Sequence, residues 1–122
     1  MGLWNAEGLT RHMDDENIKY FIKSFDICGV NETWSEDHDD FLRLVNSHDV
    51  FSNLGKRRSR FGRASGGVAV FVKKKHVKFI KQIYHDFEYG IILLLNKGHF
   101  GLHRDIIYIY MCLSPPSIIY CI

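Results

Sequence analysis

Two polar residues near the start of the sequence follow short apolar segments and carry the oxygen atoms that a metal ion prefers. Asn5 ends a predicted strand over residues 3–5, and Glu32 stands just past a predicted buried strand over residues 26–30. Adjacent strands place their carboxyl ends side by side, which is where open α/β sheets bind ligands. A carboxylate and an amide oxygen suit a hard cation such as Mg²⁺. Asn5 and Glu32 are therefore candidate metal ligands, with a solvated loop glutamate as the alternative interpretation.

The elements that must position these residues alternate between strand and helix before a run of strands. Acidic residues 14–16 favour the start of a helix, whose apolar stripe is Ile18, Phe21, Ile22 and Phe25. Ser35 is the predicted N-cap of a second helix over residues 36–45. Further strands are predicted over residues 49–52, 67–72, 77–83, 91–95 and 106–113, the last two buried on both faces or nearly so. This order predicts an α/β layered fold with a mixed sheet.

Charge divides the sequence into an acidic and a basic part. Residues 1–54 contain 11 acidic and 4 basic residues, whereas residues 55–122 contain 3 acidic and 12 basic ones. Basic clusters attract polyanions through phosphate neutralisation and counterion release. A solvated basic loop and a charged strand end are the alternative interpretation. The candidate nucleic-acid-binding residues are Arg58, Arg60, Arg63, Lys73 and Lys74.

Length and composition exclude several classes of protein. The 122 residues fit one domain, and 46% hydrophobic with 25% charged residues is ordinary globular composition, which excludes a disordered chain, a collagen and a coiled coil. No apolar run approaches the roughly 20 residues of a membrane span, and the N-terminus lacks signal-peptide features. Three widely spaced cysteines do not form a disulfide framework. We expect an intracellular protein of the nucleus or cytoplasm, neither secreted nor membrane-bound.

Five segments of the sequence match one family in order and spacing. They read WNAEGL from Trp4, FDICGVNETW from Phe25, GRASGGVAVFV from Gly62, EYGIILLL from Glu88 and FGLHRDII from Phe100. Together they span most of the 122 residues, from Trp4 to Ile107. This pattern resembles the N-terminal part of the endonuclease/exonuclease/phosphatase superfamily, and most closely the endonuclease domain of non-LTR retrotransposons, which is related to apurinic endonucleases.

The resemblance implies a fold, an activity and a partner. The fold is a partial, two-layer α/β sandwich of the four-layer α/β/β/α type, with residues 1–122 forming the N-terminal part of a single domain. The activity is DNA nicking by phosphodiester cleavage with a divalent metal, Mg²⁺ or Mn²⁺. Glu32 is then the metal-binding carboxylate, and Asn5 is the companion residue beside the metal. DNA is the implied partner, and Arg63 in the segment leading back into the sheet is a candidate for backbone contact.

The sequence departs from the family where catalysis is completed. The half of the family's domain that normally brings the D-x-N motif and the S-D-H segment is not matched in this sequence, and Cys112, or Leu113 in a shifted alignment, stands at the position of the active-site tyrosine. Whether the chain is an enzyme is therefore open, because a water nucleophile needs a positioned base. We expect a fold without its C-terminal half, catalytically incomplete alone, whose exposed sheet favours self-association. The alternatives are a non-catalytic nucleic-acid-binding module and a non-functional fragment of a mobile element.

Other candidate residues have simpler interpretations. His99 and His103 are four positions apart, but Gly98 and Gly101 argue against the helix that would align them as metal ligands. Cys28 lies in an apolar segment and is expected to be a buried small hydrophobe. Trp4 and Trp34 either pack in the core or stack on bases, and the sequence favours neither.

Overall fold

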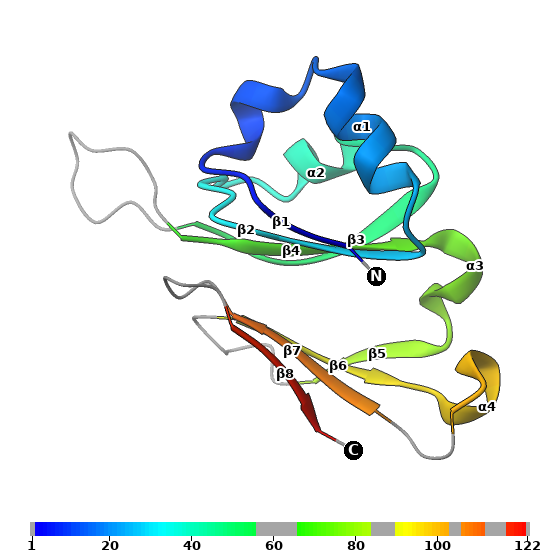
Figure 1. The fold of residues 1–122 in the computed structure, drawn as a ribbon. Helices are drawn as coiled ribbons and strands as arrows, with labels where there is room; N and C mark the ends of the chain where they lie inside the picture. The colour runs from blue at the N-terminus through cyan, green and yellow to red at the C-terminus, as the bar shows by residue number, and fades with distance from the viewer. Residues whose placement is uncertain (1, 56–65, 84–89, 103–105, 112–116, 122) are drawn as a thin grey trace.

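Two four-stranded sheets pack face to face in this computed structural model, which describes residues 2–55, 66–83, 90–102, 106–111 and 117–121. Helices cover one face of the first sheet, and the second sheet covers its other face (Figure 1). Three layers result, in the order helix, sheet, sheet. The predicted α/β class with a mixed sheet is confirmed.

The first sheet brings the ends of two predicted strands together. Its strands run in the order β1 (Gly2–Asn5), β2 (Ile27–Asn31), β4 (Val68–Lys73) and β3 (His48–Asn53). β1 is parallel to β2, with Asn5 opposite Asn31, and the other two pairings are antiparallel. β2 and β4 are central strands with buried residues along their length, as their continuous apolar sequences predict. Asn5 and Glu32 therefore emerge at the same end of the sheet.

The helices of this layer agree with the apolar periodicity in the first half of the sequence. It contains η1 (Leu9–His12), α1 (Glu16–Lys23) and α2 (Asp39–Leu44). α1 begins at the N-cap Asp15, whose carboxylate accepts a hydrogen bond of 2.9 Å from the backbone nitrogen of Asn17. Ile22 of α1 and Phe41 of α2 are fully buried and pack into the cluster that joins this layer to the sheet.

The second helix is shorter than the sequence predicts. α2 begins at Asp39, after the N-cap His38, so the prediction of a helix over residues 36–45 capped by Ser35 is wrong at its start. The Ser35 hydroxyl donates instead to the carboxylate of Asp40 at 2.6 Å. This bond holds residues 35–38 in a turn, because the hydroxyl that would have capped an earlier helix is already engaged.

The second sheet is entirely antiparallel. Its strands run in the order β5 (Ile80–Ile83), β6 (Gly90–Leu95), β7 (Ile106–Met111) and β8 (Ser117–Cys121). The sequence analysis did not predict β8. In β6, Ile91, Leu93 and Leu95 are buried, whereas Ile92 and Leu94 are half-buried. β6 thus buries one face fully, instead of both, because the described helices all lie beyond the first sheet or at the ends of strands (Figure 1).

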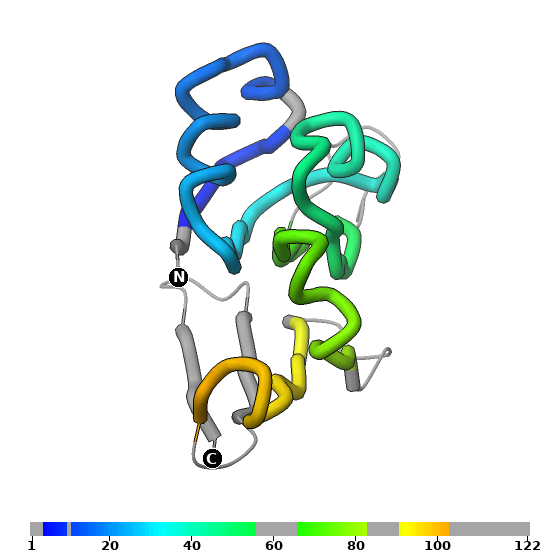
Figure 2. Tube along the Cα trace, turned by 90° about the vertical axis from the view of Figure 1, so that its right-hand side faces the viewer, coloured from blue at the N-terminus to red at the C-terminus, as the bar shows by residue number. Residues whose placement is uncertain are grey.

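Two short helices replace predicted extended or turn segments. α3 (Lys74–Val77) precedes β5, so the predicted strand over residues 77–83 is wrong at its beginning. The chain leaves the first sheet after Lys73 and crosses through α3 to the second sheet, as the green segment of Figure 2 shows. α4 (Lys97–Phe100) forms despite Gly98, because its N-cap Asn96 accepts from the nitrogen of His99 and Gly101 ends it in the left-handed region.

An apolar core joins the two sheets. Its buried residues are Ile27, Val68, Val70 and Val72 from the first sheet and Ile80, Ile91, Leu93 and Leu95 from the second. Cys28 faces the helical layer and is fully buried, which confirms its interpretation as a small hydrophobe. Burial raises the pKa of its thiol to about 12.

Candidate active site

The segments that follow β1 and β2 stay paired beyond the ends of the strands. The backbone nitrogen of Ala6 donates to the carbonyl of Asn31 at 3.0 Å, and that of Gly8 donates to the carbonyl of Glu32 at 2.8 Å. Leu9 continues the series by donating to the carbonyl of Thr33 at 2.8 Å. The structure thus brings Asn5 and Glu32 to one edge, as the parallel pairing of their strands requires.

This edge concentrates the unusual backbone conformations of the protein. Glu7, Glu32 and Trp34 are the non-glycine residues with positive φ in the described ranges, at 46°, 54° and 53°. The left-handed region costs such residues roughly 1 kcal/mol or more and is retained where surrounding contacts impose it. All three residues lie in the segments that follow β1 and β2. Backbone outliers of this kind cluster at functional sites, which favours this edge as the site.

A third segment fixes the loop after β2 from the other side. The nitrogen of Trp34 donates to the carbonyl of Gly66 at 2.9 Å, and that of Thr33 donates to the carbonyl of Gly67 at 3.3 Å. Gly67 has a φ of 91°, and a Cβ there would lie 2.9 Å from the nitrogen of Gly55. Only glycine therefore fits at position 67, next to the backbone of Gly55. The Gly66–Gly67 segment, just before β4, therefore fixes the loop after β2 that contains Glu32.

The two candidate ligands differ in their surroundings. The half-buried carboxylate of Glu32 accepts a hydrogen bond of 2.7 Å from the indole nitrogen of Trp34. Asn5 is exposed, and its side-chain oxygen accepts from the backbone nitrogen of Glu7 at 3.2 Å. Within the described part of the chain no three or more histidine, cysteine or acidic residues are grouped to hold a metal ion. Of the two candidate ligands, Glu32 offers a cation a carboxylate and Asn5 offers an amide oxygen.

Of the five predicted nucleic-acid-binding residues, the structure describes Lys73 and Lys74, and these two do not lie at this edge. Arg58, Arg60 and Arg63 fall outside the described residues. Lys73 and Lys74 lie at the far end of β4, roughly 17 Å along the strand from its beginning beside Thr33, at about 3.3 Å per residue. Lys73 is engaged there, with its amine 3.0 Å from the Asp26 carboxylate.

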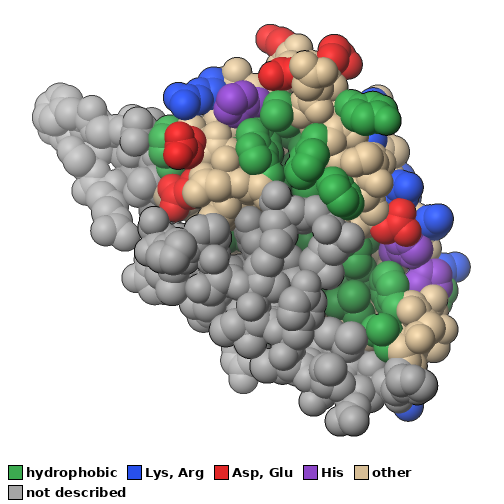
Figure 3. Space-filling view, in the orientation of Figure 1, with side chains coloured by type: hydrophobic (Ala, Val, Ile, Leu, Met, Phe, Trp, Pro, Cys, Tyr) green, Lys and Arg blue, Asp and Glu red, His purple; other side chains and the backbone are tan. Residues whose placement is uncertain are grey.

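Basic groups and histidines instead occupy the end of the sandwich where α3 and α4 lie. The lysines there are Lys73, Lys74, Lys75, Lys78, Lys81 and Lys97. Figure 3 shows blue and purple side chains at that margin, on the right of the view. This end is opposite the edge that carries Asn5 and Glu32.

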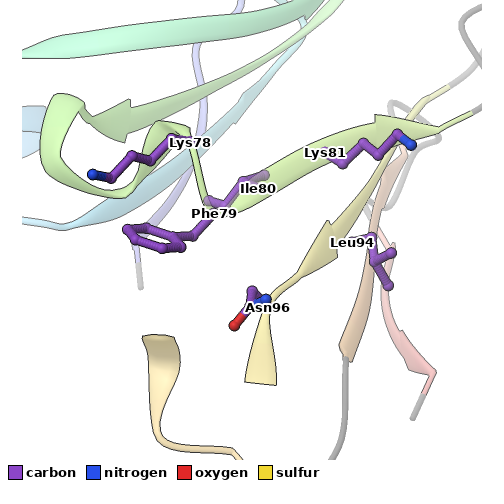
Figure 4. Close-up of a pocket in the computed structure, with 6 residues that line it drawn as sticks. All are labelled: Lys78, Phe79, Ile80, Lys81, Leu94 and Asn96. Carbon is purple, nitrogen blue, oxygen red and sulfur yellow. The ribbon is translucent and has the colours of Figure 1, made fainter. Parts of the chain in front are cut away.

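A shallow hollow of about 200 Å³ lies on the second sheet, away from the candidate site. It is lined by Lys78, Phe79, Ile80, Lys81, Leu94 and Asn96 (Figure 4). Lys81 pairs with Leu94 in the ladder, and these positions alternate with buried residues of β5 and β6. The hollow therefore opens on the face of the second sheet that points away from the core, and it includes none of the predicted ligands.

The whole described fold agrees with one protein family. The sequence profile of the endonuclease/exonuclease/phosphatase family matches residues 2–120. The chain belongs to this family. Members of the endonuclease/exonuclease/phosphatase family generally act on nucleic acids or other phosphodiester substrates and generally use divalent metals. A search of curated proteins found no match, and no helix in the described ranges is long and apolar enough to cross a membrane.

Sequence reasoning missed one residue of the site. Trp34 was predicted either to pack in the core or to stack on bases, whereas its indole nitrogen binds Glu32. The spacing of two residues between them was visible in the sequence. The spacing did not reveal the contact, because the relative direction of two side chains two positions apart depends on the backbone that joins them. Residues 32 and 34 both have positive φ, which places the two side chains together here.

Proposed function

We propose that the edge carrying Asn5 and Glu32 is the metal-binding part of a phosphodiester-cleaving site of the type found in non-LTR retrotransposon endonucleases. Family membership supports a phosphodiester-cleaving site, and the sequence segments around both residues support the retrotransposon subtype. The observation that carries the proposal is structural. The two oxygen-bearing side chains follow parallel, hydrogen-bonded strands at one end of the sheet, in the strained segments described above.

The donor set suits Mg²⁺ or Mn²⁺. Mg²⁺ prefers oxygen ligands and usually keeps several waters, so it is often held by only one or two carboxylates with other oxygens. Glu32 would supply the carboxylate and Asn5 the amide oxygen. When bound, the metal polarises a phosphate and stabilises developing charge. The protein's own contribution is to hold the two oxygens at one edge, beside backbone that the Gly66–Gly67 segment keeps in place.

The chain is proposed to supply this part of the site without the group that activates water. The sequence segments that resemble the family do not include its D-x-N and S-D-H segments, and the tyrosine position of the family falls on Cys112, outside the described residues. Among the described residues, Glu32 does not belong to a group of three or more histidine, cysteine or acidic residues that could hold a metal ion. We infer that residues 1–122, one domain's N-terminal part, bind metal and DNA but do not cleave DNA alone.

A non-catalytic nucleic-acid-binding module that uses its basic residues is the second candidate function, and one observation favours it. Exposed lysines 74, 75, 78 and 81 lie within eight positions, and the described structure pairs none of them with an acidic side chain. Such a cluster binds phosphates with an affinity that falls as salt rises. A non-functional fragment of a mobile element is the remaining interpretation, and it predicts neither specific metal binding nor cooperative unfolding.

Calorimetric titration of Mn²⁺ tests the proposal. The wild-type chain, Glu32→Gln and Glu16→Gln are compared, since Glu16 is an exposed glutamate of α1 far from the site. We expect binding by the wild type and by Glu16→Gln, and loss of binding in Glu32→Gln. Equal binding by all three folded proteins would refute the metal site.

Nicking of supercoiled plasmid with Mg²⁺ tests the inferred incompleteness. We expect no nicking by either the wild type or Glu32→Gln. Nicking that disappears in Glu32→Gln would show that the chain assembles a working site and that the inferred incompleteness is wrong.

A further inference from the structure

Trp34 makes the one described side-chain hydrogen bond to the carboxylate of Glu32. Its indole nitrogen donates to Oε2 of Glu32 over 2.7 Å, within the range of a charge-assisted bond. An indole nitrogen is only a donor, so Oε2 of Glu32 is the acceptor in this contact. The bond involves Oε2, and among the described side chains none donates a hydrogen bond to Oε1.

The backbone of residues 32–34 creates this contact. Glu32 and Trp34 have φ values of 54° and 53°, and Thr33 between them is fully buried. Backbone hydrogen bonds on both sides hold Thr33, from the nitrogen of Leu9 and to the carbonyl of Gly67. The relative orientation of the Glu32 and Trp34 side chains is therefore set by backbone that three segments fix.

The indole ring itself has little freedom. A Cβ on Gly8 would lie 2.7 Å from Cε3 of Trp34, so the glycine backbone packs directly against the ring. The guanidinium of Arg11 lies over the ring, 5.9 Å from its centroid. Both neighbours come from the segment after β1, which also carries Asn5. With these groups against it, the ring is held where its nitrogen reaches Glu32.

We propose that Trp34 is a positioning residue that fixes the Glu32 carboxylate so that a metal ion binds through Oε1 alone. This inference rests on the proposed function of Glu32. Hydrogen-bonded partners of metal-ligating carboxylates orient the ligand, and their loss typically weakens metal binding about 10- to 100-fold. One-oxygen ligation suits Mg²⁺ and Mn²⁺, whereas Ca²⁺ also uses both oxygens of a carboxylate. Trp34 therefore favours the smaller ions.

Titrations of Mn²⁺, Mg²⁺ and Ca²⁺ into Trp34→Phe test the inference, with Trp4→Phe as the matched control. Phenylalanine keeps an aromatic ring and removes the donor. We expect Trp34→Phe to bind Mn²⁺ and Mg²⁺ about 10- to 100-fold more weakly, with a smaller loss for Ca²⁺. The Trp4→Phe protein should bind all three ions as the wild type does. A role in packing alone would not change the ratio of Mg²⁺ to Ca²⁺ affinity.

A second readout protects the test against a folding defect. In the Trp4→Phe background Trp34 is the single tryptophan, and its fluorescence should change on addition of Mn²⁺ but not when Glu32→Gln is also present. Replacing Trp34 by benzothienylalanine in that background exchanges the N–H for sulfur and keeps the ring shape. We expect this replacement to reproduce the affinity loss at an unchanged melting temperature.

The outcomes distinguish a failure of the proposed metal site from a failure of the positioning role of Trp34. If the wild type binds no Mn²⁺, or Glu32→Gln binds it equally well, the proposed function fails. If Glu32→Gln loses binding while the benzothienylalanine protein binds like its parent, the metal site stands and the positioning role of Trp34 is wrong.

Discussion

Asp26 and His76 are separated by 50 residues in the sequence, yet Nε2 of His76 lies 3.0 Å from Oδ2 of Asp26. Asp26 precedes β2 in the first sheet, and His76 belongs to α3, which leads to the second sheet. His76 also shares a hydrogen bond of 2.7 Å with His99 of α4. These three side chains link the two sheets at the end opposite Glu32, where the basic groups gather (Figure 3).

The stability of the protein should depend on the ionisation of Asp26. Hydrogen bonds from His76, and then from Lys73, lower the pKa of Asp26 from 3.8 to about 2. The folded state therefore binds this proton less tightly than the unfolded chain. The contribution of Asp26 is present above pH 3.8 and is lost as the pH falls through about 2.

Urea denaturation of the wild type and Asp26→Asn at a series of pH values measures this contribution. Because the Asp26 side chain is 51% exposed, we expect a loss of less than about 1 kcal/mol at neutral pH. The difference between the two proteins should shrink as the pH approaches 2. A difference that is constant across that window would contradict the assignment.

His99 should titrate below an ordinary histidine. Partial desolvation, followed by the nearby positive groups His76, Lys78 and Lys75, lowers its pKa below 6.5. A lowered histidine pKa means that the folded state disfavours the proton, so protonation of His99 destabilises the fold as the pH falls below 6.5. NMR titration of the imidazole signals measures this pKa. Replacement of His76 by glutamine should raise it, and an unchanged pKa would show that His76 is not a cause.

The core between helices and sheet should be sensitive to truncation at Phe41. Phe41 is fully buried and packs edge-to-face against Phe71, with ring centroids 6.3 Å apart. Its replacement by alanine should lower the free energy of unfolding by about 3–5 kcal/mol. The neighbouring Leu42 is 44% exposed, so Leu42→Ala is a matched control with an expected loss below about 1 kcal/mol. If chemical denaturation showed similar losses in the free energy of unfolding for the two variants, this placement of α2 would be contradicted.

Two glycines with positive φ should respond differently to alanine. Gly67 has a φ of 91°, and an added Cβ would lie 2.9 Å from backbone, whereas Gly101 has a φ of 68° and open space around it. We expect Gly101→Ala to cost about 1 kcal/mol and Gly67→Ala about 3 kcal/mol or more.

Gly67→Ala should also weaken Mn²⁺ binding, since Gly67 holds Thr33 next to Glu32. Thermal denaturation and calorimetry measure the two effects, with Gly101→Ala as the control for metal binding. Equal behaviour of the two variants would show that the segment before β4 does not support the site.

The sequence by itself determined the elements that define the candidate site. The apolar segments before Asn5 and Glu32, the stripe of α1 and the GVAVFV segment of β4 each fix a local structure through side-chain periodicity and burial. Because parallel strands end at a common edge, the proximity of Asn5 and Glu32 followed from these segments alone. The likeness of the motifs to one family pointed to the same residues, and the family is confirmed.

Tertiary structure decided the rest. It placed Lys73 and Lys74 at the end of the sheet opposite Glu32, shortened the second helix, and turned residues 74–77 into α3. It also joined Trp34 to Glu32 and His76 to Asp26. Periodicity reports which side of one element is buried, whereas these contacts depend on how distant segments pack and on backbone angles that packing imposes. The sequence therefore indicated where the ligands stand, and only the folded chain showed what holds them there.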